Sequence, residues 1–282
     1  MTGYGEAFQR VRGQLRDGGI ENPRQEANAL FEILLNIPEE NLLAQPWQML
    51  SDEQDALLSQ AVRVRLKGYP LQYIVGRWPF YGYDFYVGEG VLIPRSDTEI
   101  LVDEARKLME AVASPVVADL CSGTGCVGIV LALLYPIARV KMVEKFDAAI
   151  HYLSRNMAMH QVENGEIIQS DIMVAPQEEQ IYDVLLSNPP YIPQGDLSGL
   201  QREVRFEPVE ALDGGGDGLM YYRAIARRWK KAIKPGGTLL FEVGAGQWEA
   251  VEDILLSNGY ERLWHSKDYN NIIRVVGARR PR

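Results

Sequence analysis

The chain has 282 residues, of which 46% are hydrophobic and 24% charged, a composition typical of an ordered globular protein. Its length fits a core domain with a smaller appended domain. The 29 basic and 38 acidic side chains give a net charge of −9. This charge disfavours nonspecific binding to nucleic acid, which depends on cations that neutralise phosphates. Two cysteines make neither a disulfide framework nor a zinc set, and no apolar stretch is long enough to cross a bilayer, so we expect a cytoplasmic protein without a membrane partner.

Residues 1–72 predict a small helical domain. Asn22-Pro23 precedes apolar residues at helical spacing, and proline is favoured at the first position of a helix. Ser51, with Gln54 three residues later, is typical of a capping box, and the helix that it begins should end near Gly68. Residues 73–95 are aromatic, punctuated by glycine and roughly alternating, which predicts a β-hairpin linker to the rest of the chain.

Residues 96–282 predict an α/β domain in which strands and helices alternate. We expect strands at 116–120, 140–144, 167–169, 184–187 and 238–243, and helices at 98–111, 128–135, 147–160 and 219–233. The first of these helices should be capped by Ser96 or Asp97. This alternation indicates a mostly parallel sheet with helices on both faces, closed by an antiparallel pair near 261–265 and 272–276. Such sheets bind ligands at the carboxyl ends of their strands.

A glycine-rich turn follows the first strand of this domain. Gly123, Gly125 and Gly128 spell G-x-G-x-x-G, which lets a ligand approach the backbone at the N-terminus of a helix. Glu144 ends the next strand, where a carboxylate can accept hydrogen bonds from a ribose diol. The combination fits a nicotinamide dinucleotide or S-adenosylmethionine, and a tight turn that binds nothing is a further explanation.

Two aspartates favour S-adenosylmethionine. The carboxylate of Asp119, just before the turn, would repel a pyrophosphate. It could instead attract the ammonium group of a methionine moiety, or hold the turn together. Asp171 follows the third strand, where it could accept a hydrogen bond from an adenine amino group or simply cap a helix.

The sequence Asn188-Pro189-Pro190-Tyr191 follows the fourth strand. The two prolines fix the backbone and remove N–H donors, so the loop presents acceptors. The Asn188 side-chain oxygen and the Pro189 carbonyl can accept both hydrogens of one –NH2 group, with the Tyr191 ring against a planar amide or base. Held in this way, the nitrogen tilts toward tetrahedral geometry and its lone pair can attack an electrophilic methyl group without a strong base. A rigid proline turn with a packed tyrosine is the alternative without a ligand.

Together these motifs resemble class I methyltransferases, and specifically the HemK/PrmC family of peptide chain release factor glutamine methyltransferases. The resemblance covers nearly the whole chain. Its most specific segments are I-P-R-x-x-T-E at Ile93–Glu99 and F-E-P-x-x-A-L-x-G-G-x-D-G-L at Phe206–Leu219. It implies a Rossmann-like, S-adenosylmethionine-dependent methyltransferase sheet, mostly parallel with an antiparallel closing strand, in residues 96–282. It also implies that the helical domain, residues 1–72, recognises the protein substrate.

The reaction implied by the resemblance is transfer of a methyl group from S-adenosyl-L-methionine to the side-chain amide nitrogen of the glutamine in the Gly-Gly-Gln motif of release factors. The product S-adenosyl-L-homocysteine would be released, and translation termination would be modulated. Catalytic roles would fall to Asn188, Pro189 and Tyr191, which with Pro190 would bind the substrate. The implied cofactor-binding residues are Phe80, Arg95, Asp119, Cys121, Ser122, Gly123, Thr124, Gly125, Glu144, Lys145, Asp171, Ile172 and Asn188.

Three positions depart from the family pattern. Cys121 stands where glycine is common, Glu144 where aspartate is common, and Ile172 where an aromatic residue is common. Glu144 keeps the diol-binding chemistry, and Ile172 would still cover the adenine face. Neither of these two changes removes a catalytic group.

Three alternatives from other classes remain open at this point. An adenine amino methyltransferase acting on DNA or RNA shares the Asn-Pro-Pro-Tyr motif, but the net charge of −9 opposes it. A nicotinamide-dependent oxidoreductase leaves that motif without a role, and a non-catalytic binding module would not need Asn188, Tyr191 and Gly125. The leading hypothesis predicts a monomer that binds release factors, with no direct nucleic-acid partner and no metal.

Overall fold

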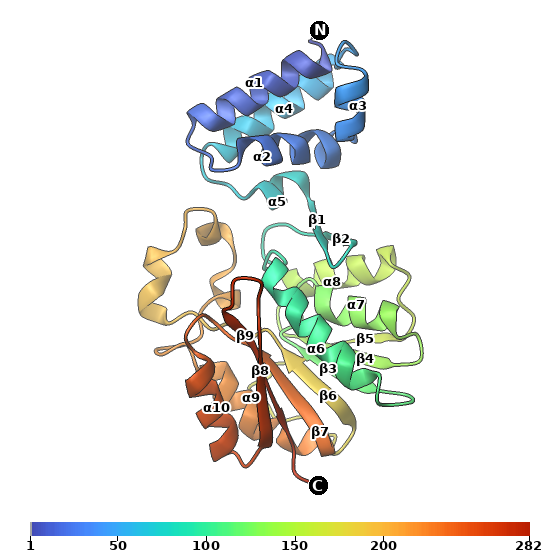
Figure 1. The fold of residues 1–282 in the computed structure, drawn as a ribbon, viewed down its shortest axis with the longest axis vertical. Coiled ribbons are helices and arrows are strands. Elements are labelled where there is room, and N and C mark those ends of the chain that lie inside the picture. Colours follow the sequence, from blue (N-terminus) through green and yellow to red (C-terminus); the bar gives the residue numbers. More distant parts are fainter. Residues whose placement is uncertain (1) are drawn as a thin grey trace. The chain divides into compact units, whose positions relative to one another are not determined.

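The computed structural model describes residues 2–282 (Figure 1). The chain divides into two compact units: one contains the residues up to Trp78 together with Gln201–Phe206, and the other contains Pro79–Leu200 and Glu207–Arg282. The expected linker 73–95 is therefore shared between the units, and the sequence did not predict that residues 201–206 belong to the first. Within the described residues, no helix has the length and apolar character needed to span a membrane.

The first unit is helical, as expected. Its capping box is present: the Ser51 side chain accepts a hydrogen bond from Gln54 N at 3.1 Å, and Ser51 N donates to Gln54 Oε1 at 3.0 Å. Pro23 begins a helix, although the Asn22 side chain makes no capping hydrogen bond. The helical elements are α1 (Tyr4–Asp17), α2 (Pro23–Ala29), the π-helix η1 (Leu30–Leu34), α3 (Glu39–Ala44), α4 (Asp52–Arg65) and α5 (Leu71–Val75).

Arg65 holds the returning segment, Gln201–Phe206, in the first unit. Its side chain is 7% exposed, and it donates to the two carboxylate oxygens of Glu26 at 2.7 and 2.8 Å and to Glu203 at 2.9 Å. The planar guanidinium matches this bidentate geometry, which offsets much of the cost of burying its charge. The Phe206 ring also meets the Tyr69 ring edge-on, with centroids 5.3 Å apart. The segment is thus fixed by a buried ion-pair network and an aromatic contact.

A seven-stranded sheet forms the centre of the second unit, with the strand order β5-β4-β3-β6-β7-β9-β8. The first five strands in this order pair in parallel, and β9 is antiparallel to both of its neighbours. This confirms the expected mostly parallel sheet with an antiparallel closing pair. The strands are β3 (Val116–Leu120), β4 (Arg139–Glu144), β5 (Gly165–Gln169), β6 (Tyr182–Ser187), β7 (Ile233–Glu242), β8 (Glu261–Lys267) and β9 (Ile273–Arg279), and a separate hairpin is formed by β1 (Arg77–Phe80) and β2 (Tyr83–Tyr86).

Helices cover both faces of this sheet (Figure 1). One hydrophobic cluster packs α6 (Glu99–Met109), α7 (Cys126–Leu134) and α8 (Asp147–Met159) on one face, and another packs α9 (Met220–Arg228) and α10 (Trp248–Ser257) on the other. The sequence did not predict α10. The predicted cap of α6 was also wrong, because Asp97 lies in a short 3₁₀ turn, η2 (Ser96–Thr98), and pairs with Arg274 at 2.8 Å. The other 3₁₀ turns are η3 (Gln194–Gly199), η4 (Val204–Phe206), η5 (Val209–Ala211) and η6 (Lys230–Ala232).

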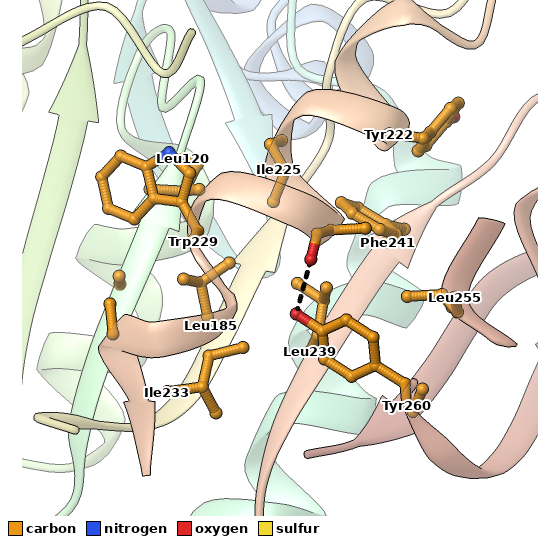
Figure 2. Close-up of a cluster of buried hydrophobic side chains, with 14 of the residues drawn as sticks. Leu120, Leu185, Tyr222, Ile225, Trp229, Ile233, Leu239, Phe241, Leu255 and Tyr260 are labelled. Carbon is orange, nitrogen blue, oxygen red and sulfur yellow. Dashed lines mark hydrogen bonds between the residues drawn. The ribbon is translucent and has the colours of Figure 1, made fainter. Parts of the chain in front are cut away.

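Figure 2 shows the core on the α9 and α10 side of the sheet. Buried aromatic side chains there satisfy their polar atoms with backbone carbonyls: Tyr260 Oη donates to Ala226 O at 3.2 Å, and Trp229 Nε1 donates to Ile172 O at 2.9 Å. A buried Trp N–H or Tyr O–H needs such a partner. The Trp229 bond has a functional consequence, since it fixes the backbone of Ile172 at the carboxyl edge of the sheet.

Candidate active site

A cavity of about 280 Å³ lies in the second unit at the carboxyl ends of the parallel strands. The strand register brings these ends together, since Leu120 of β3 pairs with both Val143 of β4 and Ser187 of β6. The cavity collects residues that are far apart in the sequence. Among the predicted site residues, it is lined by Arg95, Asp119, Cys121, Ser122, Gly123, Thr124, Glu144, Lys145, Asp171, Ile172, Asn188 and Pro190.

The glycine turn, Asp119–Gly128, has an unusual backbone. Gly125 has φ +79°, and a Cβ atom placed there would lie 2.1 Å from Leu153 Cδ1, so glycine is favoured for both conformation and space. Cys121 has φ +60°, a left-handed conformation that is costly for a residue with a side chain. A glycine would adopt this conformation without that cost, and Cys121 lines the cavity.

Glu144 is held by backbone donors. Its Oε2 accepts from Gly123 N at 2.9 Å, and its Oε1 accepts from Lys145 N at 2.8 Å and Phe146 N at 3.0 Å. These bonds use three of roughly four lone-pair directions on a carboxylate. Glu144 therefore ties the turn to the end of β4 and leaves one good acceptor direction, on Oε2, for a ligand hydroxyl.

Asp119 stabilises the start of α7. The residue is 2% exposed, and its Oδ2 accepts from Gly128 N at 3.0 Å. Burial raises the pKa of its carboxyl group to about 7, opposed by the hydrogen bonds and assisted by the nearby charge of Glu144. Of the two roles expected for Asp119, holding the turn together is the one that this geometry provides, and the residue also reaches the cavity wall.

The segment after β5 supplies a second carboxylate. Asp171 accepts from Met173 N at 2.9 Å and pairs with Lys145 Nζ at 3.0 Å. Although burial acts in the opposite direction, these contacts lower the pKa of Asp171 below its ordinary value. Ile172 is 4% exposed and lines the cavity beside it. A charged acceptor and an apolar face thus lie side by side.

Two buried polar residues that the sequence did not single out brace the cavity. Asn156 on α8 donates to Thr124 O at 2.9 Å and exchanges hydrogen bonds with the backbone of Tyr86, which joins the glycine turn to the hairpin. Glu207, whose side chain is 1% exposed, pairs with Arg95 and accepts from Ile93 N at 2.9 Å. The available signal for Glu207 was its place in the F-E-P segment, which had been treated only as a mark of resemblance.

The Asn188 side chain is oriented by Thr98. Asn188 Nδ2 donates to Thr98 Oγ1 at 3.2 Å, and Asn188 lines the cavity. In the part of the chain that the structure describes, no residue donates to Asn188 Oδ1 or to Pro189 O. The loop therefore retains two acceptors that pair with no described residue.

Tyr191 lies behind the cavity wall. Burial raises the pKa of its hydroxyl to about 12, and its carbonyl accepts from Gln247 Nε2 at 2.8 Å. The glycine-rich segment packs on its backbone, since a Cβ atom at Gly218 would lie 2.4 Å from Tyr191 O. This close approach gives the D-G-G-G-D-G stretch a physical reason: it supports the Asn-Pro-Pro-Tyr loop from behind.

Four predicted site residues do not line the cavity: Phe80, Gly125, Pro189 and Tyr191. For Gly125, Pro189 and Tyr191 the neighbouring residues do so. Phe80 is different, because it is 2% exposed and packs on Phe85 with ring centroids 6.1 Å apart, inside the core. Its placement therefore does not support the expected cofactor contact, since alternation along β1 turns this side chain inward.

Two solved structures share this fold. A methyltransferase from Pyrococcus furiosus aligns with a TM-score of 0.51 at 13% identity, covering 83% of this chain and all of that one. The hMettl16 catalytic domain aligns with a TM-score of 0.55 at 13% identity, covering 84% of each chain. At such low identity the likeness concerns the fold alone.

Sequence relatives identify the family. Residues 6–76 match the PrmC N-terminal domain, and residues 96–221 match the methyltransferase small domain. The release factor glutamine methyltransferase of Geobacter sulfurreducens is 40% identical, over 95% of this chain and 94% of that protein. The protein of the same name from Moorella thermoacetica is 37% identical, over 92% of this chain and 90% of that protein. The chain belongs to the family of release factor glutamine methyltransferases, in agreement with the resemblance found in its sequence.

Proposed function

We propose that this protein methylates the side-chain amide nitrogen of the glutamine in the Gly-Gly-Gln motif of peptide chain release factors, with S-adenosylmethionine as the methyl donor. The main support for this proposal is the Asn188 side chain, which lines the cavity. Its Nδ2 donates a hydrogen bond to Thr98 Oγ1, and its Oδ1 pairs with no described residue. Its acceptors suit any planar-bound –NH2 group. Membership of the family favours glutamine over the alternative, an adenine amino group in DNA or RNA.

The cavity residues fit S-adenosylmethionine. Glu144 keeps an acceptor direction on Oε2 for a ribose hydroxyl, and Asp171 can accept from an adenine amino group beside the apolar face of Ile172. The buried carboxyl group of Asp119 lies on the wall where the cationic part of the molecule would be placed. A pyrophosphate would be repelled by these three carboxylates, so a dinucleotide fits less well.

The cofactor, when bound, supplies an electrophilic methyl group. Asn188 Oδ1 and the Pro189 carbonyl would accept the two N–H groups of the glutamine amide and so set the direction of its nitrogen lone pair. The same acceptors would stabilise the positive charge that develops on this nitrogen as it becomes tetrahedral. The wall formed by Pro190 and the half-buried Tyr191 would keep the loop from moving away.

The remaining features are part of the same proposal. The helical unit would recognise the release factor as a folded protein, and the active enzyme would be a cytoplasmic monomer without a direct nucleic-acid partner. The net charge of −9 is consistent with a protein rather than a nucleic-acid substrate.

The test is transfer of labelled methyl from S-adenosylmethionine to a purified bacterial release factor, beside the same factor with its motif glutamine changed to alanine. Label on the first and none on the second establishes the reaction and the target side chain. Equal label on both would reject the target residue. No label on either, with the cofactor bound, would reject the proposed substrate, and DNA and ribosomal RNA would then be assayed.

A further inference from the structure

Glu242 is a buried carboxylate that the proposed mechanism does not use. It is the last residue of β7, whose partner β6 leads directly into Asn188, and it is 3% exposed. Its Oε2 has no hydrogen-bond partner among the described residues. Leaving such an atom unpaired costs free energy, so its presence calls for an explanation.

The side chains of Thr98 and Asn188 both interact with this carboxylate. Burial raises the pKa of Glu242 to about 7, while hydrogen bonding by the side chains of Thr98 and Asn188 opposes the rise. The other charged and titratable groups that interact with it are Asp97 before α6, Arg274 on β9, the Cys126 thiol on α7, and the hydroxyl groups of Tyr191 and Tyr222.

In the part of the chain that the structure describes, Arg274 is the cation that acts on Glu242. Its guanidinium is shared between Asp97 at 2.8 Å and Asp268 at 2.9 Å. The groups that can donate to Glu242 from the cavity side are therefore the Thr98 hydroxyl and the Asn188 amide.

This arrangement selects one orientation of the Asn188 amide. The Thr98 hydroxyl has one hydrogen, and when it donates to the carboxylate it can only accept from Asn188. Asn188 Nδ2 does donate to Thr98 Oγ1 at 3.2 Å, which turns Oδ1 away from the carboxylate. The reverse orientation would place the amide oxygen against an acceptor-only carboxylate. The two ends of an amide are similar in size, so this polarity is what distinguishes them.

We propose that Glu242 is a positioning residue that acts through Thr98 to keep the Asn188 side-chain oxygen directed at the substrate amide. The inference rests on the proposed function, in which Asn188 Oδ1 is an acceptor for the glutamine –NH2 group. Protonation of Glu242 would remove the selection, since a carboxylic acid can donate to Thr98, whose hydroxyl could then donate to Asn188 Oδ1.

The first test is single-turnover methylation of a release factor at pH 8 by Glu242→Gln, Thr98→Val, Thr98→Ser and the parent protein. A glutamine can either accept or donate, so we expect Glu242→Gln to lower the methyl-transfer rate on the order of 10²-fold, with cofactor affinity unchanged. Thr98→Val should lower the methyl-transfer rate about tenfold because it removes the hydroxyl group. Thr98→Ser keeps the hydroxyl group and should therefore keep the parent rate. Glu104→Gln is the matched control, since Glu104 is also a buried glutamate of this unit but pairs with Lys107, and it should keep the parent rate.

The second test does not depend on turnover. In ¹⁵N-labelled protein without cofactor, the Asn188 side-chain amide resonances, assigned by their loss in Asn188→Asp, should titrate between about pH 6 and 8 in the parent and not in Glu242→Gln. A parent rate retained by both Glu242→Gln and Thr98→Val, or a titration that persists in Glu242→Gln, would overturn the inference. Absence of methylation by the parent protein would instead reject the proposed function, while the resonance titration would still decide whether Glu242 controls Asn188.

Discussion

In the glycine turn, Gly123 N and Gly128 N donate to Glu144 and Asp119 at 2.9 and 3.0 Å, whereas in the Asn-Pro-Pro-Tyr loop the acceptors Asn188 Oδ1 and Pro189 O pair with no described residue. The turn satisfies its polar groups internally and is therefore a preformed scaffold. The loop keeps its acceptors free because two prolines remove the local donors. The comparison separates the residues that shape the cavity from those available for chemistry.

The substitution Asn188→Ala is the most direct test of this difference between the turn and the loop. If the loop supplies the chemistry, kcat should fall about 10²–10³-fold, the range seen when one preorganised electrostatic group is removed from an active site. Cofactor affinity, measured by calorimetry, should stay close to that of the parent because the turn is untouched. Unchanged turnover would contradict the proposed amide contacts.

Glycine replacements compare the rigidity of the two regions. Gly125→Ala would meet the end of the Leu153 side chain, which can move, but Gly218→Ala would meet the backbone of Tyr191, which cannot, and both positions have positive φ. We expect each to lower the free energy of unfolding by about 2–4 kcal/mol, with Gly218→Ala the more damaging.

Gly216→Ala is the control for these replacements, because that position is exposed, has no positive φ and has no atom within 4 Å of the added Cβ. Denaturant unfolding of the three variants at one pH measures the differences. Equal stability of Gly218→Ala and Gly216→Ala would show that the glycine segment does not brace the loop.

The pH dependence of stability tests the burial of Asp119. Its folded-state pKa is raised to about 7, so the folded protein favours the protonated form, and this contribution to stability is complete below pH 4 and is lost as the pH rises to 7. Asp119→Asn keeps an acceptor for Gly128 N and removes the titration. The variant should lose less stability than the parent between pH 4 and 7, as measured by the midpoint of denaturant unfolding. Parallel curves for both proteins would argue against a buried, titrating Asp119.

Lys145→Ala should have the smallest effect. The Lys145 and Asp171 side chains are 53% and 34% exposed, and ion pairs of this kind contribute about 0–1 kcal/mol. Cofactor affinity should therefore change by less than about fivefold in a binding titration. A larger loss would show that the Lys145 side chain itself contacts the cofactor, beyond the backbone bond that it gives to Glu144.

The sequence was sufficient to predict features that depend on neighbouring residues, such as strand limits and helix caps, and the residues that follow parallel strands. The strand Val116–Leu120 was predicted at its observed limits, and the Ser51 capping box is present. The residues after β3, β4, β5 and β6 were expected at one edge because parallel strands share their carboxyl ends, and most of them line the cavity. Phe80 packs in the core and does not line the cavity, and the sequence could not show this because one aromatic residue in a hairpin can face either side.

Sequence by itself determined the class of fold and the identity of the acceptor loop, because hydrophobic periodicity, glycine spacing and two consecutive prolines act over a few residues. The family followed from the resemblance of whole segments such as Ile93–Glu99 and Phe206–Leu219. Only the tertiary structure decided which buried polar groups gather at the carboxyl edge of the sheet. Glu242, Thr98 and Glu207 come from separate segments and are joined at the sheet edge by strand register and packing. The return of residues 201–206 to the helical unit has the same cause, since the ion pairs of Arg65 with Glu26 and Glu203 form between residues 39 and 138 positions apart. Contacts between residues so far apart produce no local or periodic pattern in the sequence, so they can be identified only in the folded structure.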